Sequence, residues 1–248
     1  MAINLVKGQT IDLRKNDKGE SFDLSLVTIG LGWDVREPDS SGLFGKLFNS
    51  EKSDDYDLDA VAFLLNDKDK VENLGTDLRV NASFKVAFCK SDIVYFNNLT
   101  FPSGNFGAYA NLSKSEIAAK VKKLINSGEY VIHTGDNLTG EGEGDDEQII
   151  VMLDSMPDRI KKIVFLVSIY QGSQKNQNFA MVENAFMRAV DKNGKEIARY
   201  GFSGDPSLKT CRSFIFGELY KKEGTWKFRA LGEPLETDSF VEVLRRYV

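Results

Sequence analysis

The chain has 248 residues, of which 42% are hydrophobic and 28% are charged, and its formal net charge is -5. This composition is that of an ordinary globular protein, and the length allows one large all-β domain or two small ones. The acidic balance argues against direct binding to nucleic acid or to an anionic membrane, because both require a basic surface.

The absence of recognisable targeting signals and the small number of cysteines both fit a cytoplasmic protein. The start of the chain lacks a charged head followed by a long apolar run, and the sequence contains no stretch of about eighteen apolar residues. We therefore expect a cytoplasmic protein. Cys89 and Cys211 are far apart and lack the spacing of metal ligands, which favours buried free thiols over a disulfide or a zinc site.

Short runs rich in Val, Ile, Phe and Tyr, bounded by Gly, Asn and Asp, predict β-strands along most of the chain. In chain order these strands are expected at 23–33, 59–66, 93–97, 130–134, 148–154 and 162–171. Two hairpins should follow, one joining 185–190 to 196–202 and one joining 212–220 to 225–231. Asn193-Gly194 in the first hairpin predicts a type I′ turn. Many short strands with regular turns predict an antiparallel β-sandwich.

Helices are expected at three places. Ser113 and Glu116 form a capping box, and the apolar stripe within 117–125 predicts a helix that ends at Ser127. A shorter helix is predicted over 179–184, before its strand. A third should close the chain, with Phe240, Val243 and Leu244 on one face packed against the sheet.

The run 136–147 is the most informative feature, because it places six carboxylates in twelve residues with glycines between them. Lys and Arg are absent from Leu124 through Asp158, so nothing nearby in the sequence neutralises the run. Two carboxylates about 6 Å apart at an effective dielectric near 20 repel by roughly 3 kcal/mol. Calcium takes oxygen ligands in a flexible geometry, and glycines let the backbone approach an ion closely. We therefore predict a calcium site.

The same run predicts how its ligands are arranged. The segment Asp145-Asp146-Glu147 leads into a strand, and alternation along a strand predicts Asp145 and Glu147 on one face, so two ions could lie close together. Further oxygens could come from a second acidic segment and an amide pair, namely Asp55, Asp57, Asp59, Asn97 and Asn98.

Two other loop types fit the run less well. Asp136 and Glu147 occupy the first and twelfth positions of an EF-hand loop, but Glu141 stands where the sharp turn requires Gly. A phosphate-binding loop is disfavoured because the carboxylates would repel the anion. A solvated acidic loop is the remaining structural alternative, and the glycine spacing, the lack of Lys or Arg and the following strand favour a metal site over it.

His133 is the only histidine, so a catalytic triad or a base beside a metal would have to use it. A single histidine at a strand end is more often a hydrogen-bonded structural residue than a base. Two functional alternatives remain, a hydrolase in which the ion activates water and an acidic adaptor that binds a basic partner without metal. Trp33 and Trp226 are expected in the core.

Several motifs, in order along the chain, resemble the TerD family of tellurium-resistance and stress proteins. They are GLGWD at 30–34, DLDA at 57–60, HTGDNLTGEGEGDDE at 133–147, NAF at 184–186 and FGELY at 216–220. KGQT at 7–10 and GLFGKLF at 42–48 resemble its TerZ branch in particular. The long acidic motif is highly specific.

The resemblance implies one β-sandwich domain over 1–248, with insertions near 37–56, 71–92 and 106–129. It also implies a non-enzymatic role in tellurite and chemical stress, phage resistance or bacteriocin tolerance. The expected partners are related stress proteins, in a complex near the membrane and without nucleic acid. Two Ca²⁺ ions are implied, and the implied ligands are Asp57, Asp59, Asp136, Asn137, Thr139, Glu141, Glu143, Asp145, Asp146 and Glu147.

Overall fold

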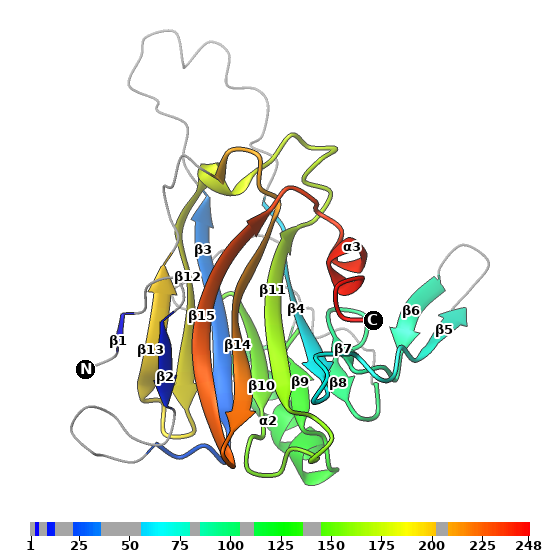
Figure 1. The fold of residues 1–248 in the computed structure, drawn as a ribbon, viewed down its shortest axis with the longest axis vertical. Coiled ribbons are helices and arrows are strands. Elements are labelled where there is room, and N and C mark those ends of the chain that lie inside the picture. The colour runs from blue at the N-terminus through cyan, green and yellow to red at the C-terminus, as the bar shows by residue number, and fades with distance from the viewer. Residues whose placement is uncertain are drawn as a thin grey trace, which may run out of the picture.

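The protein is a mostly β sandwich of two antiparallel sheets with short helices, as the sequence predicts (Figure 1). The computed structural model describes residues 3–4, 9–12, 22–35, 56–79, 85–104, 112–135, 145–201 and 208–248. The expected insertion near 37–56 therefore lies outside the described residues, apart from Tyr56, and so do residues 106–111 of the third insertion.

Sheet A has seven strands in the order β1-β13-β12-β3-β10-β9-β8 within the described parts of the chain. The bounds of these strands are β1 Ile3–Asn4, β13 Glu196–Gly201, β12 Val182–Asp191, β3 Val27–Val35, β10 Glu147–Val151, β9 Val131–His133 and β8 Thr100–Phe101. Pairing is antiparallel throughout, except that β1 lies parallel to β13 at the edge.

Sheet B has six described strands in the order β2-β15-β14-β11-β4-β7. Their bounds are β2 Thr10–Asp12, β15 Thr225–Leu235, β14 Ser213–Lys222, β11 Lys162–Ile169, β4 Leu58–Leu65 and β7 Ile93–Val94. The chain turns back after β7 because Tyr95 and Asn98 exchange backbone hydrogen bonds. The predicted strand over 93–97 is therefore wrong beyond Val94.

The core lies between the two sheets. Along β3 the side chains of Val27, Ile29, Leu31 and Trp33 alternate inward and are all buried. Strand β4 is buried on both faces, because a second apolar cluster covers the outer side of sheet B. The core also holds Trp226, as predicted, and Cys89 and Cys211 are buried free thiols.

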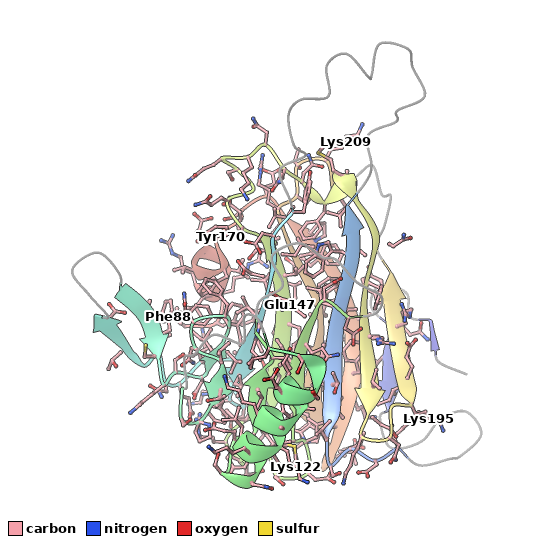
Figure 2. All side chains as sticks on the ribbon, turned by 180° about the vertical axis from the view of Figure 1, so that it is seen from behind. Phe88, Lys122, Glu147, Tyr170, Lys195 and Lys209 are labelled. Atoms are coloured by element: carbon pink, nitrogen blue, oxygen red, sulfur yellow. The ribbon has the colours of Figure 1, made fainter. Side chains whose placement is uncertain are left out.

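Two helices cover the outer faces. Helix α2 (Lys114–Asn126) begins at the predicted capping box, and its Val121 packs on Ile132 and Ile150 of sheet A (Figure 2). Helix α3 (Phe240–Leu244) packs Val243 and Leu244 on sheet B, as expected from the sequence. The predicted short helix before β12 is a 3₁₀ turn, η1 (Phe179–Met181). Among the described residues, no helix is long and apolar enough to cross a membrane.

The turn between β12 and β13 differs from the type I′ turn that Asn193-Gly194 predicts. Gly194 has φ of +78° but Asn193 does not adopt a positive φ, so the turn after β12 is not type I′. The Asp191 side chain accepts from the backbone N–H groups of Asn193 and Lys195, at 2.9 Å each, which favours a three-residue loop with Gly194 left-handed. Glu223 and Gly224, both at positive φ, make the two-residue turn between β14 and β15.

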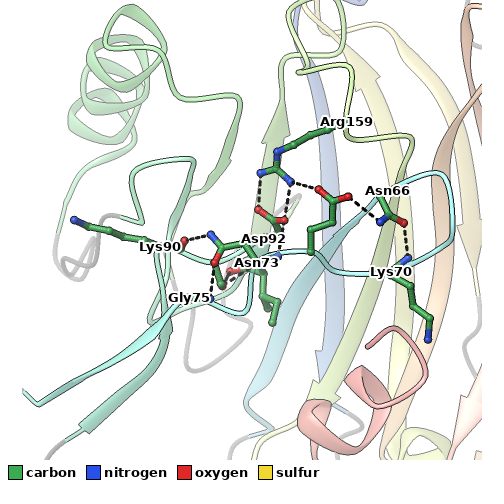
Figure 3. Close-up of polar contacts among 10 residues, drawn as sticks. Asn66, Lys70, Asn73, Gly75, Lys90, Asp92 and Arg159 are labelled. Atoms are coloured by element: carbon green, nitrogen blue, oxygen red, sulfur yellow. Dashed lines mark hydrogen bonds and ion pairs between the residues drawn. The ribbon is translucent and has the colours of Figure 1, made fainter.

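Strands β5 (Thr76–Arg79) and β6 (Lys85–Cys89) form a separate two-stranded ribbon that projects from the sandwich (Figure 1). An ion pair between a buried carboxylate and a partly exposed guanidinium holds the base of this ribbon (Figure 3). Asp92 is fully buried and accepts two hydrogen bonds of 2.7 Å from the Arg159 guanidinium, and it also accepts from the backbone of Asn73. This pair joins the segment before β7 to the loop between β10 and β11.

Arg159→Gln should destabilise the protein by about 3 kcal/mol, because it leaves the buried Asp92 carboxylate without its cation. Lys161→Gln is the matched control, since Lys161 pairs with Asp158, whose side chain is 85% exposed, and it should cost less than about 1 kcal/mol. Urea denaturation measures both. Equal losses in the two variants would contradict the structural role of the Arg159–Asp92 pair.

Candidate functional site

The structure brings the two acidic segments together where β4 and β10 begin. The backbone N–H of Ala60 donates to Glu147 Oε2 at 2.7 Å, in a buried position. Tyr170 N–H donates to the carbonyl of Asp57 at 2.8 Å and so joins the start of β4 to the end of β11. Glu147 of the segment 145–147 therefore contacts β4, the strand that follows Asp57, and we call the two segments 57–59 and 145–147 the acidic edge.

Asp146 is held by β3. Its backbone N–H donates to Leu31 O at 2.8 Å, and its Oδ2 accepts from the Trp33 backbone N–H at 3.0 Å. The indole of Trp33 is only 2% exposed, so this carboxylate lies beside a well-packed part of the core. Strand β3 thereby fixes the backbone of the acidic edge one residue before β10 starts.

Asp145 lies on the outer face of sheet A. Its Oδ1 accepts from Arg188 Nε at 2.7 Å and its Oδ2 accepts from Gln148 Nε2 at 3.1 Å. The carboxylate rests on Gly30, where a Cβ atom would come within 2.2 Å of it. Ile29 and Leu31 on either side of Gly30 point into the core, so the Gly30 position faces outward.

The prediction that Asp145 and Glu147 share a face is wrong. Strand β10 starts only at Glu147, so the alternation expected of a strand does not extend back to Asp145. The Glu147 side chain is buried between the sheets and lines, with Ile149 and Met187, a cavity of about 20 Å³. That volume has room for about one water molecule and for no larger ligand.

Arg188 corrects the expectation that the acidic run is without a cation. It stands 43 residues after Asp145 in the sequence, and the pairing of β12 with β3 brings it there by placing Arg188 opposite Gly30. Sequence reasoning missed Arg188 because only the register of these two strands identifies it. The clue available from the sequence is Gly30, a residue without a side chain in the middle of a predicted strand.

His133 is fully buried beside the acidic edge. Its Nδ1 accepts from the Gly135 backbone N–H at 3.1 Å, so in the neutral ring the proton is on Nε2, which lies 3.5 Å from Glu147 Oε2. This is the hydrogen-bonded structural histidine that the sequence favours. Asn98 is also engaged elsewhere, since its Nδ2 donates to Ile93 O at 2.6 Å and its Oδ1 accepts from Lys90 N–H.

Half of the implied ligands lie outside the described residues, namely Asp136, Asn137, Thr139, Glu141 and Glu143. They belong to residues 136–144, which connect Gly135, two residues after β9, to Asp145 in the acidic edge. In the described part of the chain, no group of three or more His, Cys, Asp or Glu side chains is arranged to hold a metal. The carboxylates of the two acidic segments offer only oxygen atoms, which is the donor chemistry that suits a hard cation such as Ca²⁺.

Comparison with known proteins identifies the family. The TerD domain matches residues 1–120 and 121–247. This chain belongs to the TerD family. It is 43% identical, over 248 residues and 100% of both chains, to tellurium resistance protein TerX of Serratia marcescens. It is 36% identical, over 251 residues and 100% of both chains, to stress response protein SCP2 of Bacillus subtilis (strain 168).

The TerZ branch of the TerD family is not specifically favoured. TerZ of Serratia marcescens is 34% identical over 93% of this chain and 89% of its own, which is below the identity to TerX. The fold agrees with the crystal structure of a homologue of telluride resistance protein (TerD) from Streptomyces coelicolor A3(2). That comparison has a TM-score of 0.51 and 15% identity, and it covers 90% of this chain and 98% of the other.

Gly30→Ala should destabilise this TerD-family protein by about 1–3 kcal/mol, because the new methyl group would displace the Asp145 carboxylate and strain its bond to Arg188. Gly201→Ala is the matched control in the same sheet, since its Cβ would meet nothing closer than 3.9 Å. Chemical denaturation compares the two. Equal stability of both variants would show that Asp145 does not occupy this position.

Proposed function

We propose that this TerD-family protein is a calcium-binding, non-enzymatic module of the tellurite and chemical stress response. The observation that carries the proposal is the meeting of two acidic segments at one edge of the sandwich, joined by the Ala60–Glu147 hydrogen bond of 2.7 Å. The names of the relatives TerX and SCP2 support the assignment to tellurium resistance and stress response.

In this proposal, the ions are held by carboxylates from both sides of the edge. Asp57, Asp59 and Asp146 bind from the described segments, together with the donors of 136–144, and two ions are expected. Asp145 and Glu147 support the site from beneath, because Arg188 and Ala60 already hold their carboxylates. Bound Ca²⁺ would supply the positive charge that offsets the repulsion among these groups.

The alternative of a metal-dependent hydrolase receives less support from the site. His133 is the only histidine in the sequence, and its ring is fully buried with Nδ1 accepting from Gly135. A ring in that position cannot reach a substrate from the surface. In the proposal the protein instead acts in the cytoplasm by assembling with related stress proteins, including members of a membrane-associated complex.

Calcium titration by isothermal calorimetry, after removal of metal with a chelator, tests the proposal. We expect binding with a stoichiometry of about two, and about 2.7 kcal/mol of added stability for each bound ion when free calcium is one hundred times its Kd. An unchanged melting temperature in calcium and in chelator would contradict it. A chelator-insensitive, strongly salt-dependent capture of a basic partner would favour the metal-free adaptor instead.

Asp146→Asn should weaken calcium binding at least tenfold, because it removes a ligand charge while keeping the size of the side chain. Asp154→Asn is the charge-matched control, since Asp154 is exposed beyond the far end of β10. The same calorimetric titration measures both. If the two variants bind calcium equally well, Asp146 is not a ligand.

A further inference from the structure

We propose that Arg188 is a positioning residue for the calcium-binding segment, acting through Asp145. This inference rests on the proposed function, since it concerns how the same site is held. Arg188 lies on β12, outside both acidic segments, and it is not one of the implied calcium ligands. Its role follows from where it holds the chain, at Asp145, the residue that connects 136–144 to the start of β10.

The contact between Arg188 and Asp145 is well shielded. The Asp145 side chain is 2% exposed and that of Arg188 is 27% exposed, and the 2.7 Å bond between them is charge-assisted. Gln148 holds the second oxygen of the carboxylate, and Gly30 leaves the space that it fills. The pKa of Arg188 is raised, chiefly by its hydrogen bond to Asp145 and against the effect of burial.

Arg188 is itself held from the other side. Its Nη1 lies 3.3 Å from Glu196, and Glu196 accepts from Arg199 at 3.0 and 2.9 Å. The Arg199 guanidinium stacks on the Phe186 ring at 4.0 Å from its centroid. Four alternating charges therefore run from Asp145, two residues before β10, across β12 and β13 with no net charge. Glu196 is the member of this row that contacts Arg188 directly, whereas the contacts of Arg199 are to Glu196 and Phe186.

Three successive carboxylates are thus fixed by three different strands. Asp145 is held by Arg188 on β12, Asp146 by the Trp33 backbone on β3, and Glu147 by the Ala60 backbone on β4. A segment fixed before the ion arrives loses less conformational freedom on binding, so the affinity is higher. Mutation of a partner that hydrogen-bonds a metal ligand typically lowers metal affinity by about 10- to 100-fold, and Arg188 acts one contact further out, through Asp145, so the lower end of this range is expected.

A positioning role and a purely electrostatic role of Arg188 predict opposite changes in the Kd for calcium when this residue is replaced. If Arg188 acted only as a nearby positive charge, replacing it would make the edge more negative and tighten calcium binding. If it positions the segment, replacing it weakens binding despite the more favourable charge. The sign of the change in Kd therefore separates the two roles, and a change in folding stability alone would not produce it.

Calcium titration of the full chain tests the inference, with wild type, Arg188→Gln and Arg199→Gln compared below their melting temperatures in chelator. We expect Arg188→Gln to weaken Kd about tenfold. Arg199→Gln removes the same charge but not the contact to Asp145, and should stay within about twofold of wild type. Arg188→Gln that binds calcium as tightly as wild type, or more tightly, would overturn the proposal.

Two further variants keep the result interpretable. Arg188→Lys retains the charge but lacks the guanidinium Nε–H. A positioning role therefore predicts weaker calcium binding in this variant, whereas a pure charge effect predicts unchanged binding. Asp145→Asn combined with Arg188→Gln should cost no more affinity than Arg188→Gln alone, and additive losses would contradict a shared action. A wild-type chain that binds no calcium would refute the proposed function itself, whereas calcium binding unaffected by Arg188 refutes only this inference.

Discussion

The constraint on which this structure depends is the repulsion among carboxylates gathered at one edge of a β-sandwich. Each of the three carboxylates at the start of β10 is held by a donor from another strand, at 2.7 Å for Asp145, 3.0 Å for Asp146 and 2.7 Å for Glu147. The donors are a guanidinium and two backbone N–H groups. Strand pairing within sheet A creates the first two contacts, and the packing of sheet B on sheet A creates the third, so the arrangement of the charges follows from the folded sandwich.

In the proposed site, the acidic edge divides into supporting carboxylates and ligating carboxylates. Glu147 and His133 are buried between the sheets, and Asp145 is covered by Arg188 on the outer face. The carboxylates proposed to bind calcium are those of Asp57, Asp59 and Asp146, of which Asp59 is itself buried, together with those of 136–144. Because a buried carboxylate without a partner is costly, the supporting residues are best explained by the precision that they give to their neighbours.

Much of the fold is predictable from the sequence, and the reasons for the misses are specific. Helix α2 follows from its capping box, and the long strands β3, β11 and β14 follow from apolar runs bounded by turn residues. Strands β1 and β8 have only two residues each, so no local pattern reveals them. The Asp145–Arg188 pair depends on strand register, and the position of Asp145 depends on where β10 begins. Neither is encoded by residue spacing.

The central claim is that calcium lies at the acidic edge, between 57–59 and the segment that returns at Asp145. A crystal structure of the protein grown in saturating calcium tests it most directly. The account predicts ion density bound by oxygen atoms of Asp57, Asp59 or Asp146 and of residues 136–144, at about 2.3–2.6 Å. An ordered segment 136–144 with its carboxylates directed into solvent and no ion among them would contradict it.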